Sequence, residues 1–478
     1  MRFKFLLLFT FLLASSSLSQ PTLKEKIAQM IMVGFSGTSV PDSLRYDIQN
    51  RKLGGVVLFA SNINNPTQIK NLTAQLQSYG NNQLLISIDQ EGGRVARLNQ
   101  NNGFAATNSA YKLGTVFNRE DSTRQTAKVM AGWLSQNGIN VNLAPVADVN
   151  VNPNSPAIGK LDRSYSKIPD TVSSHISWFM DEFHKKNILT TLKHFPGHGS
   201  AATDSHLGFT DITETWADSE LVPFSSAINQ GIADLIMIGH LFNSNIDSLH
   251  PASLSFNAIT KLLRDTLGFN GVVISDELFM QAISANYTLE EAVELCIKAG
   301  TDILLFNKSI HNNKSLAGYL VDVVSSKINQ GVIAESLIDS SYNRIQRLKQ
   351  RFVTEVQFAD AEIPGEFILY QNYPNPFNPS TKIRYTIPAL TPSLSQRERV
   401  MLKVFDILGN EVATLVNDEK SPGTYEVEFS VSSGSASSNK YPVSHKAAGS
   451  IVNLASGIYF YRLQAGTFAQ TRKMMLLH

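Results

Sequence analysis

Short apolar runs alternate with amphipathic stretches through the first two thirds of the chain, as buried strands alternate with helices in a parallel sheet. Eight runs have the length of a buried strand: residues 30–35, 55–59, 84–88, 141–144, 188–192, 235–238, 272–274 and 303–306. The pattern predicts an α/β fold. A parallel (β/α)8 TIM-type barrel and a doubly wound sheet both fit it.

The pattern changes near residue 352. Residues 334–352 have the apolar spacing of a helix that closes the first domain, and a linker is predicted at 358–366. Beyond it, alternating apolar and polar positions between turn signals predict a small all-β sandwich of the immunoglobulin-like type, with strands at residues 383–387, 401–406, 411–416, 425–429 and 458–463. Polar stretches at 391–399 and 432–450 predict flexible insertions.

Residues 1–19 have a basic start, an apolar run and a small-residue end, as a secretory signal does. The predicted domains are therefore a signal at 1–19, a barrel at 20–357, the linker, and a β-sandwich at 367–478. The run is too short to span a membrane in the mature protein, and no later segment is apolar enough to do so. Cys296 is the single cysteine, which excludes an intrachain disulfide, and its apolar helical surroundings predict a core residue.

The charges of the 478-residue chain nearly cancel, since 41 basic and 40 acidic residues give a formal net charge of +1. No basic run stands out, so nucleic acid is not an expected partner. Polar residues instead follow several predicted strands directly: Asp89, Lys193 with His194, His240 and Asp276. Strand ends of a barrel meet at one rim, where active sites lie. For any one aspartate taken alone, a cap for the next helix is the commoner explanation.

One of these strand ends leads into an unusual loop. Residues 193–199 read Lys-His-Phe-Pro-Gly-His-Gly, and Asp-Ser-His follows at 204–206. His194 and His198 have the spacing of two zinc ligands on a helix, but the proline and glycines between and after them prevent that helix, so no metal is expected. A structural role for His198 is equally compatible with the pattern. Asp204 is placed to fix the tautomer of His206 and raise its basicity.

These two strings together resemble the signature of family 3 glycoside hydrolases, specifically the β-N-acetylglucosaminidase branch. The resemblance implies the barrel rather than the doubly wound sheet. It also implies a retaining exo-β-N-acetylglucosaminidase that acts on peptidoglycan fragments or chitooligosaccharides without a cofactor. A β-glucosidase or xylosidase of the same fold, and a catalytically silent carbohydrate-binding surface protein, are the competing hypotheses.

The resemblance also implies roles for individual residues. Asp276 matches the nucleophile, with Glu277 beside it as the competitor, and His206 with Asp204 matches the acid/base pair. The Gly- and Ala-rich segment 197–202 is expected to let this pair swing over the substrate. The positions that match substrate-binding residues, some of them through the string Asp-Gln-Glu-Gly-Gly-Arg at 89–94, are Asp89, Arg97, Arg163, Lys193 and His194.

The residues themselves suggest further assignments in this region. An internal ion pair is expected between Glu91 and Arg94. Asp148, Asn150 and Asn152 are expected either to shape a neighbouring loop or to touch the sugar, and His240 is expected to be structural.

The last quarter of the chain carries a second resemblance. The string Asn-Tyr-Pro-Asn-Pro-Phe-Asn-Pro at 372–379, the segment 405–409 and the segment 456–459 resemble the C-terminal sorting domain of the type IX secretion system. That implies contact with the type IX machinery and a final location outside the cell or on its outer surface. An accessory carbohydrate-binding or spacer module of the same fold is the alternative.

Overall fold

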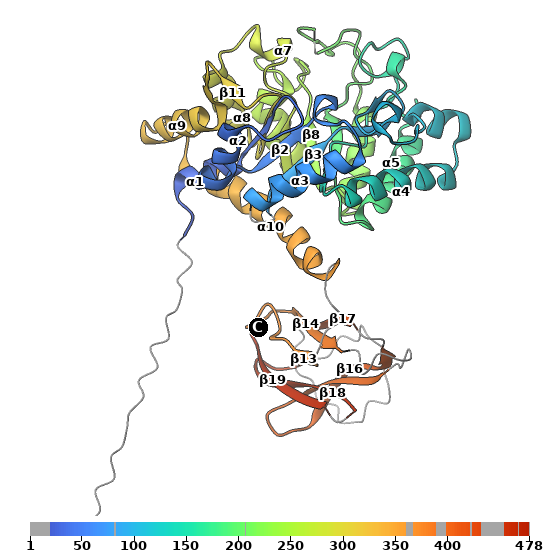
Figure 1. Cartoon of the computed structure of the whole chain (residues 1–478), viewed down its shortest axis with the longest axis vertical. Coiled ribbons are helices and arrows are strands. Elements are labelled where there is room, and N and C mark those ends of the chain that lie inside the picture. Colours follow the sequence, from blue (N-terminus) through green and yellow to red (C-terminus); the bar gives the residue numbers. More distant parts are fainter. Residues whose placement is uncertain are drawn as a thin grey trace, which may run out of the picture. The chain divides into compact units, whose positions relative to one another are not determined.

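The computed structural model describes residues 20–80, 83–205, 207–359, 367–388, 398–420, 423–431, 454–466 and 468–477. The chain divides into two compact units, Met1–Val353 and Thr354–His478. Each unit is shown in Figure 1 and is described by itself. The predicted signal at 1–19 lies outside the described residues.

The first unit is built on eight parallel strands in one sheet, in the order β10-β1-β2-β3-β6-β7-β8-β9. At the two ends of this order a parallel bridge joins Ile274 to Ile303, and Ser275 N donates to Ile303 O at 2.9 Å. The sheet thus curls into a nearly closed barrel, and each predicted strand falls on an observed one. The strands are β1 (Ile31–Gly34), β2 (Gly55–Leu58), β3 (Leu85–Ile88), β6 (Val141–Asn142), β7 (Leu189–Phe195), β8 (Leu235–Ile238), β9 (Val272–Ser275) and β10 (Leu304–Phe306).

Helical segments connect successive strands, as a right-handed parallel barrel requires. Figure 1 shows α7, which follows β9, at one end of this unit, and α1 and α10 at the opposite end. The α-helices are α1 (Leu23–Gln29), α2 (Asp42–Tyr46), α3 (Pro66–Tyr79), α4 (Glu120–Gln136), α5 (Pro169–His184), α6 (Val222–Asn229), α7 (Gln281–Ser284), α8 (Leu289–Ala299), α9 (Leu316–Asn329) and α10 (Glu335–Ala359).

Shorter elements complete the connections. They are the π-helical segments η1 (Asp47–Arg51), η4 (Lys112–Phe117) and η8 (Asn257–Thr266), the 3-10 turns η2 (Ala60–Asn62), η3 (Gln100–Asn102), η5 (Gly159–Leu161), η6 (Asp218–Leu221) and η7 (Ala252–Leu254), and the hairpins β4 (Gln90–Gly92) with β5 (Val95–Ala96) and β11 (Ile310–His311) with β12 (Lys314–Ser315).

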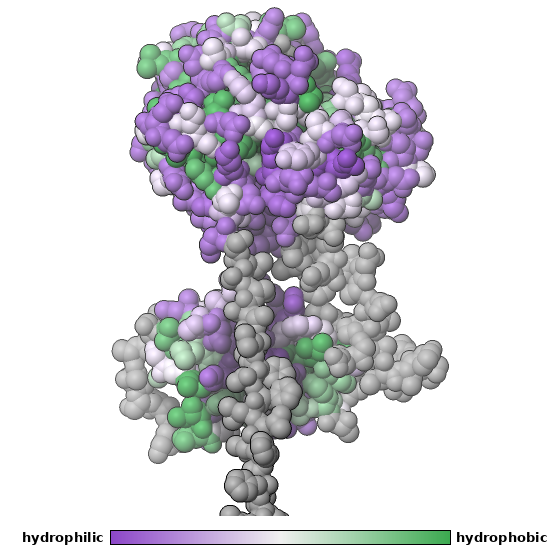
Figure 2. All heavy atoms as spheres, turned by 60° about the vertical axis from the view of Figure 1, so that its left-hand side comes forward, coloured by the Kyte–Doolittle hydropathy of each residue, from purple (hydrophilic) through white to green (hydrophobic). Residues whose placement is uncertain are grey.

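The barrel strands are buried at every position, which is why they appear in the sequence as continuous apolar runs. Two hydrophobic clusters fill the unit, and Cys296 of α8 lies in the larger one with its Sγ directed at Ser253 O. On the face of the barrel unit seen in Figure 2 hydrophilic residues predominate and hydrophobic ones are scattered. No helix in the described part of the chain is long and apolar enough to cross a membrane.

In the barrel region two predicted ends differ from the structure by three residues or more. Strand β7 continues three residues beyond the predicted end at 192, because Ala147 N donates to Lys193 O at 2.7 Å and Phe195 pairs with Ile238 across a register shift. Helix α10 continues to Ala359, past the predicted start of the linker at 358, since neither glycine nor proline occurs before Pro364 to stop it. The rest of the linker, 360–366, lies outside the described residues.

The second unit contains a three-stranded sheet, β13-β14-β17, and a four-stranded sheet, β16-β15-β18-β19. Pairing within both is antiparallel, and one hydrophobic cluster contains buried residues from both sheets. Its strands are β13 (Ile368–Leu369), β14 (Ser380–Ile387), β15 (Glu398–Phe405), β16 (Glu411–Lys420), β17 (Gly423–Ser430), β18 (Gly457–Ala465) and β19 (Phe468–Leu476).

All five predicted strands of this unit are present, whereas β13 and β19 were not predicted. Strand β19 alternates polar and apolar residues and begins after a short turn that contains Gly466. Residues 398–399 of the predicted insertion 391–399 belong to β15. The rest of that insertion and all of 432–450 lie outside the described residues.

Candidate active site

The ends of β3 and β7 are joined by a buried lysine. The Lys193 Nζ lies 2.8 Å from Asp89 Oδ1 and 2.7 Å from Glu91 Oε1, and its side chain is 3% exposed. Burial alone would lower the pKa of Lys193, but the two carboxylates hold this pKa above its ordinary value. The ammonium therefore stays charged at the rim of the barrel, on the side where Asp89 and His194 also lie.

Arg163 completes this network from a separate loop. Its Nε and one terminal nitrogen donate to the two oxygens of Glu91 at 2.9 and 2.8 Å, and the other terminal nitrogen donates to Ala157 O at 2.9 Å. The expected pairing of Glu91 with Arg94 was wrong: Arg94 is exposed, and Glu91 pairs with Arg163 and Lys193. Arg163 binds both oxygens of Glu91 and holds the carboxylate in a fixed plane, which explains why Glu91 pairs with Arg163 and not with Arg94.

Both carboxylates of the network are kept ionised by their neighbours. Burial would raise the pKa of Asp89, but the charges of Lys193 and Arg97 hold it well below its usual range. The Arg97 terminal nitrogen lies 3.0 Å from Asp89 Oδ2. For Glu91, the charges of Arg163 and Lys193 outweigh burial and lower the pKa to about 2. The predicted substrate-binding residues Asp89, Arg97, Arg163, Lys193 and His194 are therefore brought together in one charged cluster.

His194 is fixed by a carboxylate beneath it. Asp148 Oδ2 lies 2.7 Å from His194 Nδ1, while Oδ1 accepts from the backbone N–H groups of His194 at 3.0 Å and His198 at 2.8 Å. Asp148 is fully buried, so it shapes the loop rather than touching a sugar. The His194 Nε2 lies 3.3 Å from an Arg163 nitrogen, so this edge of the ring lies beside the charged cluster.

The loop after β7 is fixed over its first residues. Residues 196–201 are all buried, and Asn152 binds two of their backbone oxygens: Gly199 O at 3.0 Å and Ala201 O at 3.2 Å. A Cβ on Gly199 would come within 1.6 Å of Val149 O. In the structure the glycines of this segment permit close packing of residues 197–201, and the expected swing of the segment 197–202 stays a prediction. Of the described residues that follow, positions 202, 203, 207 and 209 are exposed, Asp204 and Gly208 are half-buried, and Ser205 is buried.

One member of the predicted acid/base pair, Asp204, lies among these residues. Asp204 is half-buried, whereas His206 lies outside the described residues. Between them, Ser205 is buried with its Oγ 3.2 Å from His198 Nε2. Burial and the neighbouring His194 lower the pKa of His198 to about 4, so its ring is neutral near neutral pH. In this structure His198 therefore supports the loop, which is the structural role considered for it.

Asp276 follows β9 and is half-buried. Its backbone N–H donates to Ile238 O of β8 at 3.1 Å, and Gly239 N donates to Phe195 O of β7 at 2.9 Å. These bonds place the ends of β9, β8 and β7 in succession around the rim. Glu277 has a different setting, since its Oε1 accepts from the backbone N–H groups of Phe279 and Asn307, both at 3.1 Å. The Oε1 of Glu277 is therefore already bonded to two backbone N–H groups.

His240 has the expected structural role. Its Nδ1 lies 2.7 Å from Ser253 Oγ and its Nε2 lies 2.9 Å from Glu277 O, and the ring is buried. These two contacts hold the backbone directly after Asp276.

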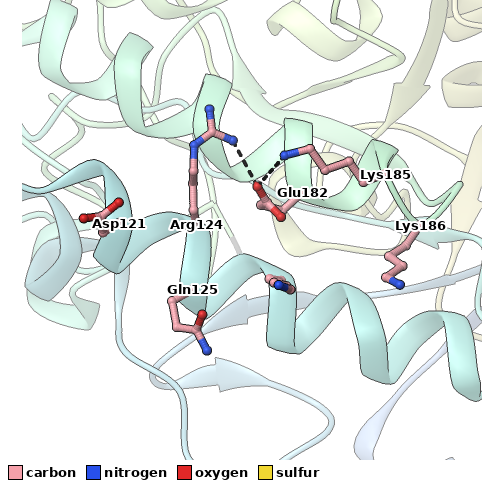
Figure 3. A pocket seen from close by; sticks show the side chains of 7 residues that line it. Asp121, Arg124, Gln125, Glu182, Lys185 and Lys186 are labelled. Carbon is pink, nitrogen blue, oxygen red and sulfur yellow. Dashed lines mark hydrogen bonds and ion pairs between the residues drawn. The ribbon is translucent and has the colours of Figure 1, made fainter.

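Among the described residues no group of three or more His, Cys, Asp or Glu side chains could hold a metal ion. A surface pocket of about 640 Å³ lies on helices α4 and α5, outside the barrel (Figure 3). There Glu182 accepts from Arg124 at 3.0 Å and from Lys185 at 2.7 Å.

Glu220 was not predicted from the sequence to be a residue of the site. It is fully buried beneath the loop, and Oε2 accepts from Gly199 N at 3.1 Å and Ser200 N at 3.3 Å. Burial and the negative charge of Asp148 raise its pKa to about 7. A signal was present, since Glu220, Phe224 and Ala227 share one helical face that is otherwise apolar.

Comparison with known proteins identifies relatives of the barrel unit. Residues 22–348 match the glycosyl hydrolase family 3 N-terminal domain. The chain is 33% identical over 342 residues to the β-hexosaminidase A of Pseudoalteromonas piscicida, covering 66% of this chain and 56% of that protein. It is 32% identical over 322 residues to a β-hexosaminidase of Tolumonas auensis, covering 66% of this chain and 92% of that protein.

A solved structure gives the same result. The family 3 β-N-acetylglucosaminidase of a Paenibacillus species superposes with a TM-score of 0.66 at 34% sequence identity, covering 72% of this chain and 65% of that one. The similarity therefore extends over the barrel unit in sequence and in fold.

We expect Glu91→Gln to lower the free energy of unfolding of the barrel by about 3 kcal/mol at pH 7, because it leaves two buried cations with one carboxylate fewer. The pKa of Glu91 is lowered in the fold to about 2, so its contribution is complete above the unfolded value of 4.5 and is lost as the pH falls towards 2. The difference between variant and wild type should therefore shrink in acid.

Urea unfolding followed by tryptophan fluorescence measures this difference, because Trp133, Trp178 and Trp216 all lie in the barrel unit. Glu214→Gln, at an exposed position, is the matched control. Equal stability of the two variants would show that the charge network does not stabilise the fold.

Proposed function

The chain belongs to glycosyl hydrolase family 3, and from this premise we propose that it is a retaining exo-β-N-acetylglucosaminidase, a β-N-acetylhexosaminidase in class. Its substrates would be peptidoglycan fragments or chitooligosaccharides with a terminal N-acetylglucosamine. The observation that carries the proposal is the succession of strand ends at one rim: Asp276 after β9, Lys193 and His194 at the end of β7, and Asp89 after β3. The β-hexosaminidase and β-N-acetylglucosaminidase names of the relatives support it.

In this proposal Asp276 is the nucleophile. A nucleophilic carboxylate must stay ionised and be held rigidly below the anomeric carbon, which suits a half-buried residue at a strand end. The backbone bond from Asp276 to β8 and the contact of His240 with Glu277 O restrict its position. Glu277 is a poorer candidate because burial raises its pKa and two backbone N–H groups already occupy its Oε1.

The charged cluster would hold the sugar. Asp89 is charged and suited to accept hydrogen bonds from two hydroxyl groups, while Lys193, His194 and Arg163 present donors at the same rim. Because these groups are already paired in the absence of sugar, little reorganisation is needed when the sugar arrives. Arg97 is tied to Asp89 and would reach the sugar beside it.

His206, oriented by Asp204, would donate a proton to the leaving oxygen and later take one from water. Retention follows from a covalent bond between Asp276 and the anomeric carbon, formed as the leaving group departs and broken when water attacks. A histidine that has given up its proton is neutral, so it repels an approaching anion less than a carboxylate would. The exposed stretch 202–209 would bring this pair to the substrate.

The proposal extends to export. Residues 1–19 would act as a secretory signal, and the second unit would act as a type IX sorting domain with an immunoglobulin-like sandwich fold, bringing the enzyme to the cell exterior or outer surface. The sequence strings at 372–379, 405–409 and 456–459 support it, as does the separate hydrophobic core of this unit. An independently packed module can be recognised without disturbing the barrel.

Asp276→Asn should reduce hydrolysis of nitrophenyl β-N-acetylglucosaminide by at least about a thousandfold, because the amide cannot form the glycosyl-enzyme. Glu277→Gln is the matched control and should keep a much larger fraction of kcat. Steady-state kinetics of the full chain measure both. Full activity of the Asp276 variant would refute the proposed mechanism. A wild type that prefers the β-glucoside would favour a β-glucosidase or xylosidase, and one that binds sugar without cleaving it a carbohydrate-binding protein.

His206→Ala should slow substrates with poor leaving groups by about 10²–10⁴-fold and slow activated aryl glycosides much less, since only a poor leaving group needs the proton. The comparison uses kcat/KM for a chitooligosaccharide and for the dinitrophenyl glycoside. Equal losses on the two substrates would contradict the acid role of His206.

Deletion of residues 367–478 should leave the activity inside the cell envelope of a bacterium with a type IX system, whereas the full chain should appear on the surface or in the medium. Activity measured in fractionated cells tests this expectation. Equal secretion of both forms would favour an accessory or spacer role for the second unit.

A further inference from the structure

The loop after β7 is attached to the barrel at two places, one on each side of its exposed stretch. On the leading side, residues 196–201 are buried and bonded as described above. On the returning side, Thr210 O accepts from Phe242 N and Ile212 N donates to Phe242 O, both at 2.9 Å. Ala201 and Ile212 lie in one small hydrophobic cluster with Leu241. The exposed stretch 202–209 thus spans two fixed points.

Glu220 packs against the leading attachment, residues 196–201, and binds its backbone. A Cβ on Gly197, whose φ is +131°, would come within 2.7 Å of Glu220 Cβ and 2.9 Å of Oε2, so the carboxylate packs directly against this glycine. The same Oε2 receives the N–H groups of Gly199 and Ser200. Oε1 is buried and has no hydrogen-bond partner among the described residues. A carboxylate in such surroundings is costly for stability, which argues for a use outside folding.

We propose that Glu220 is a positioning residue that holds the start of the loop after β7 and thereby sets the position of Asp204, the residue proposed to orient the acid His206. This inference rests on the proposed function for its kinetic consequence. Glu220 accepts hydrogen bonds from the loop backbone at Gly199 and Ser200, and we expect it to act through this backbone. Its element, η6, lies next to α6 and is separate from the strand ends that carry the cluster.

The strength of the hydrogen bonds between Glu220 and the loop backbone depends on pH. Burial raises the pKa of Glu220 to about 7, with Asp148 as the nearby negative charge. The other titratable groups here are His194, bound to Asp148, and His198, whose pKa is lowered to about 4. Above pH 7 the ionised carboxylate accepts the two backbone hydrogen bonds more strongly than the neutral acid does. The loop is therefore held most firmly above pH 7 and loosens as Glu220 is protonated below it.

The test compares Glu220→Gln with wild type in the full chain. The amide has the size of the neutral acid and carries no charge at any pH. The ratio of wild-type to variant kcat on a chitooligosaccharide should rise from near one at pH 5.5 to about tenfold at pH 8.5, with little change in KM. The ratio for the dinitrophenyl glycoside should stay near one. Asp218→Asn, at an exposed position of the same short element, is the control and should match wild type throughout.

A second measurement needs no activity. The Trp216 Nε1 donates to Pro196 O at 3.1 Å, so its fluorescence reports on the leading attachment. Wild type should show a fluorescence transition centred near pH 7 that is absent in Glu220→Gln and present in Asp218→Asn. A pH-independent kcat ratio, or a Trp216 transition that persists without Glu220, would overturn the inference. If wild type cleaves no N-acetylglucosaminide, the proposed function fails and the Trp216 titration alone decides the role of Glu220.

Discussion

The charged rim depends on the burial of Lys193. An ammonium with 3% exposure is tolerable only when carboxylates neutralise it, and Asp89 and Glu91 from the end of β3 do so at 2.8 and 2.7 Å. Glu91 in turn needs Arg163, which brings in the loop after β6. One buried charge thereby fixes three separate segments relative to one another. A site assembled in this way is rigid before any sugar enters, which is the property that positioning a substrate requires.

The rim and the loop after β7 differ in how firmly they are held. The groups proposed to bind sugar are buried and paired, whereas the proposed acid/base pair lies in a stretch of mostly exposed residues between two attachments. Asp148 connects the two regions, because one buried carboxylate fixes the His194 ring and also the backbone of His198. Glu220 lies on the other side of the same backbone. In the proposed mechanism the fixed region would bind the sugar, and the exposed stretch would bring the proton donor to it.

The second unit has its own physical basis. Its buried residues come from both antiparallel sheets and form a cluster of their own, and the barrel is filled by other clusters. Neither core requires residues of the other unit. A chain with this division can carry catalysis in one unit and addressing in the other, and each is open to change without loss of the other.

The sequence by itself determined the eight barrel strands, because strands buried on both faces are apolar at every position, and it determined which polar residues follow them. It also determined the family, through the strings at 89–94, 193–199 and 204–206. It did not determine the partners of those residues. Glu91 has Arg94 nearby in sequence but pairs with Arg163 and Lys193, and Glu220 looks like part of an ordinary helix start yet is buried beneath the loop. Burial and charge pairing arise between segments far apart in the chain, so only the closed barrel decides which carboxylate meets which cation and which glycine is closely packed.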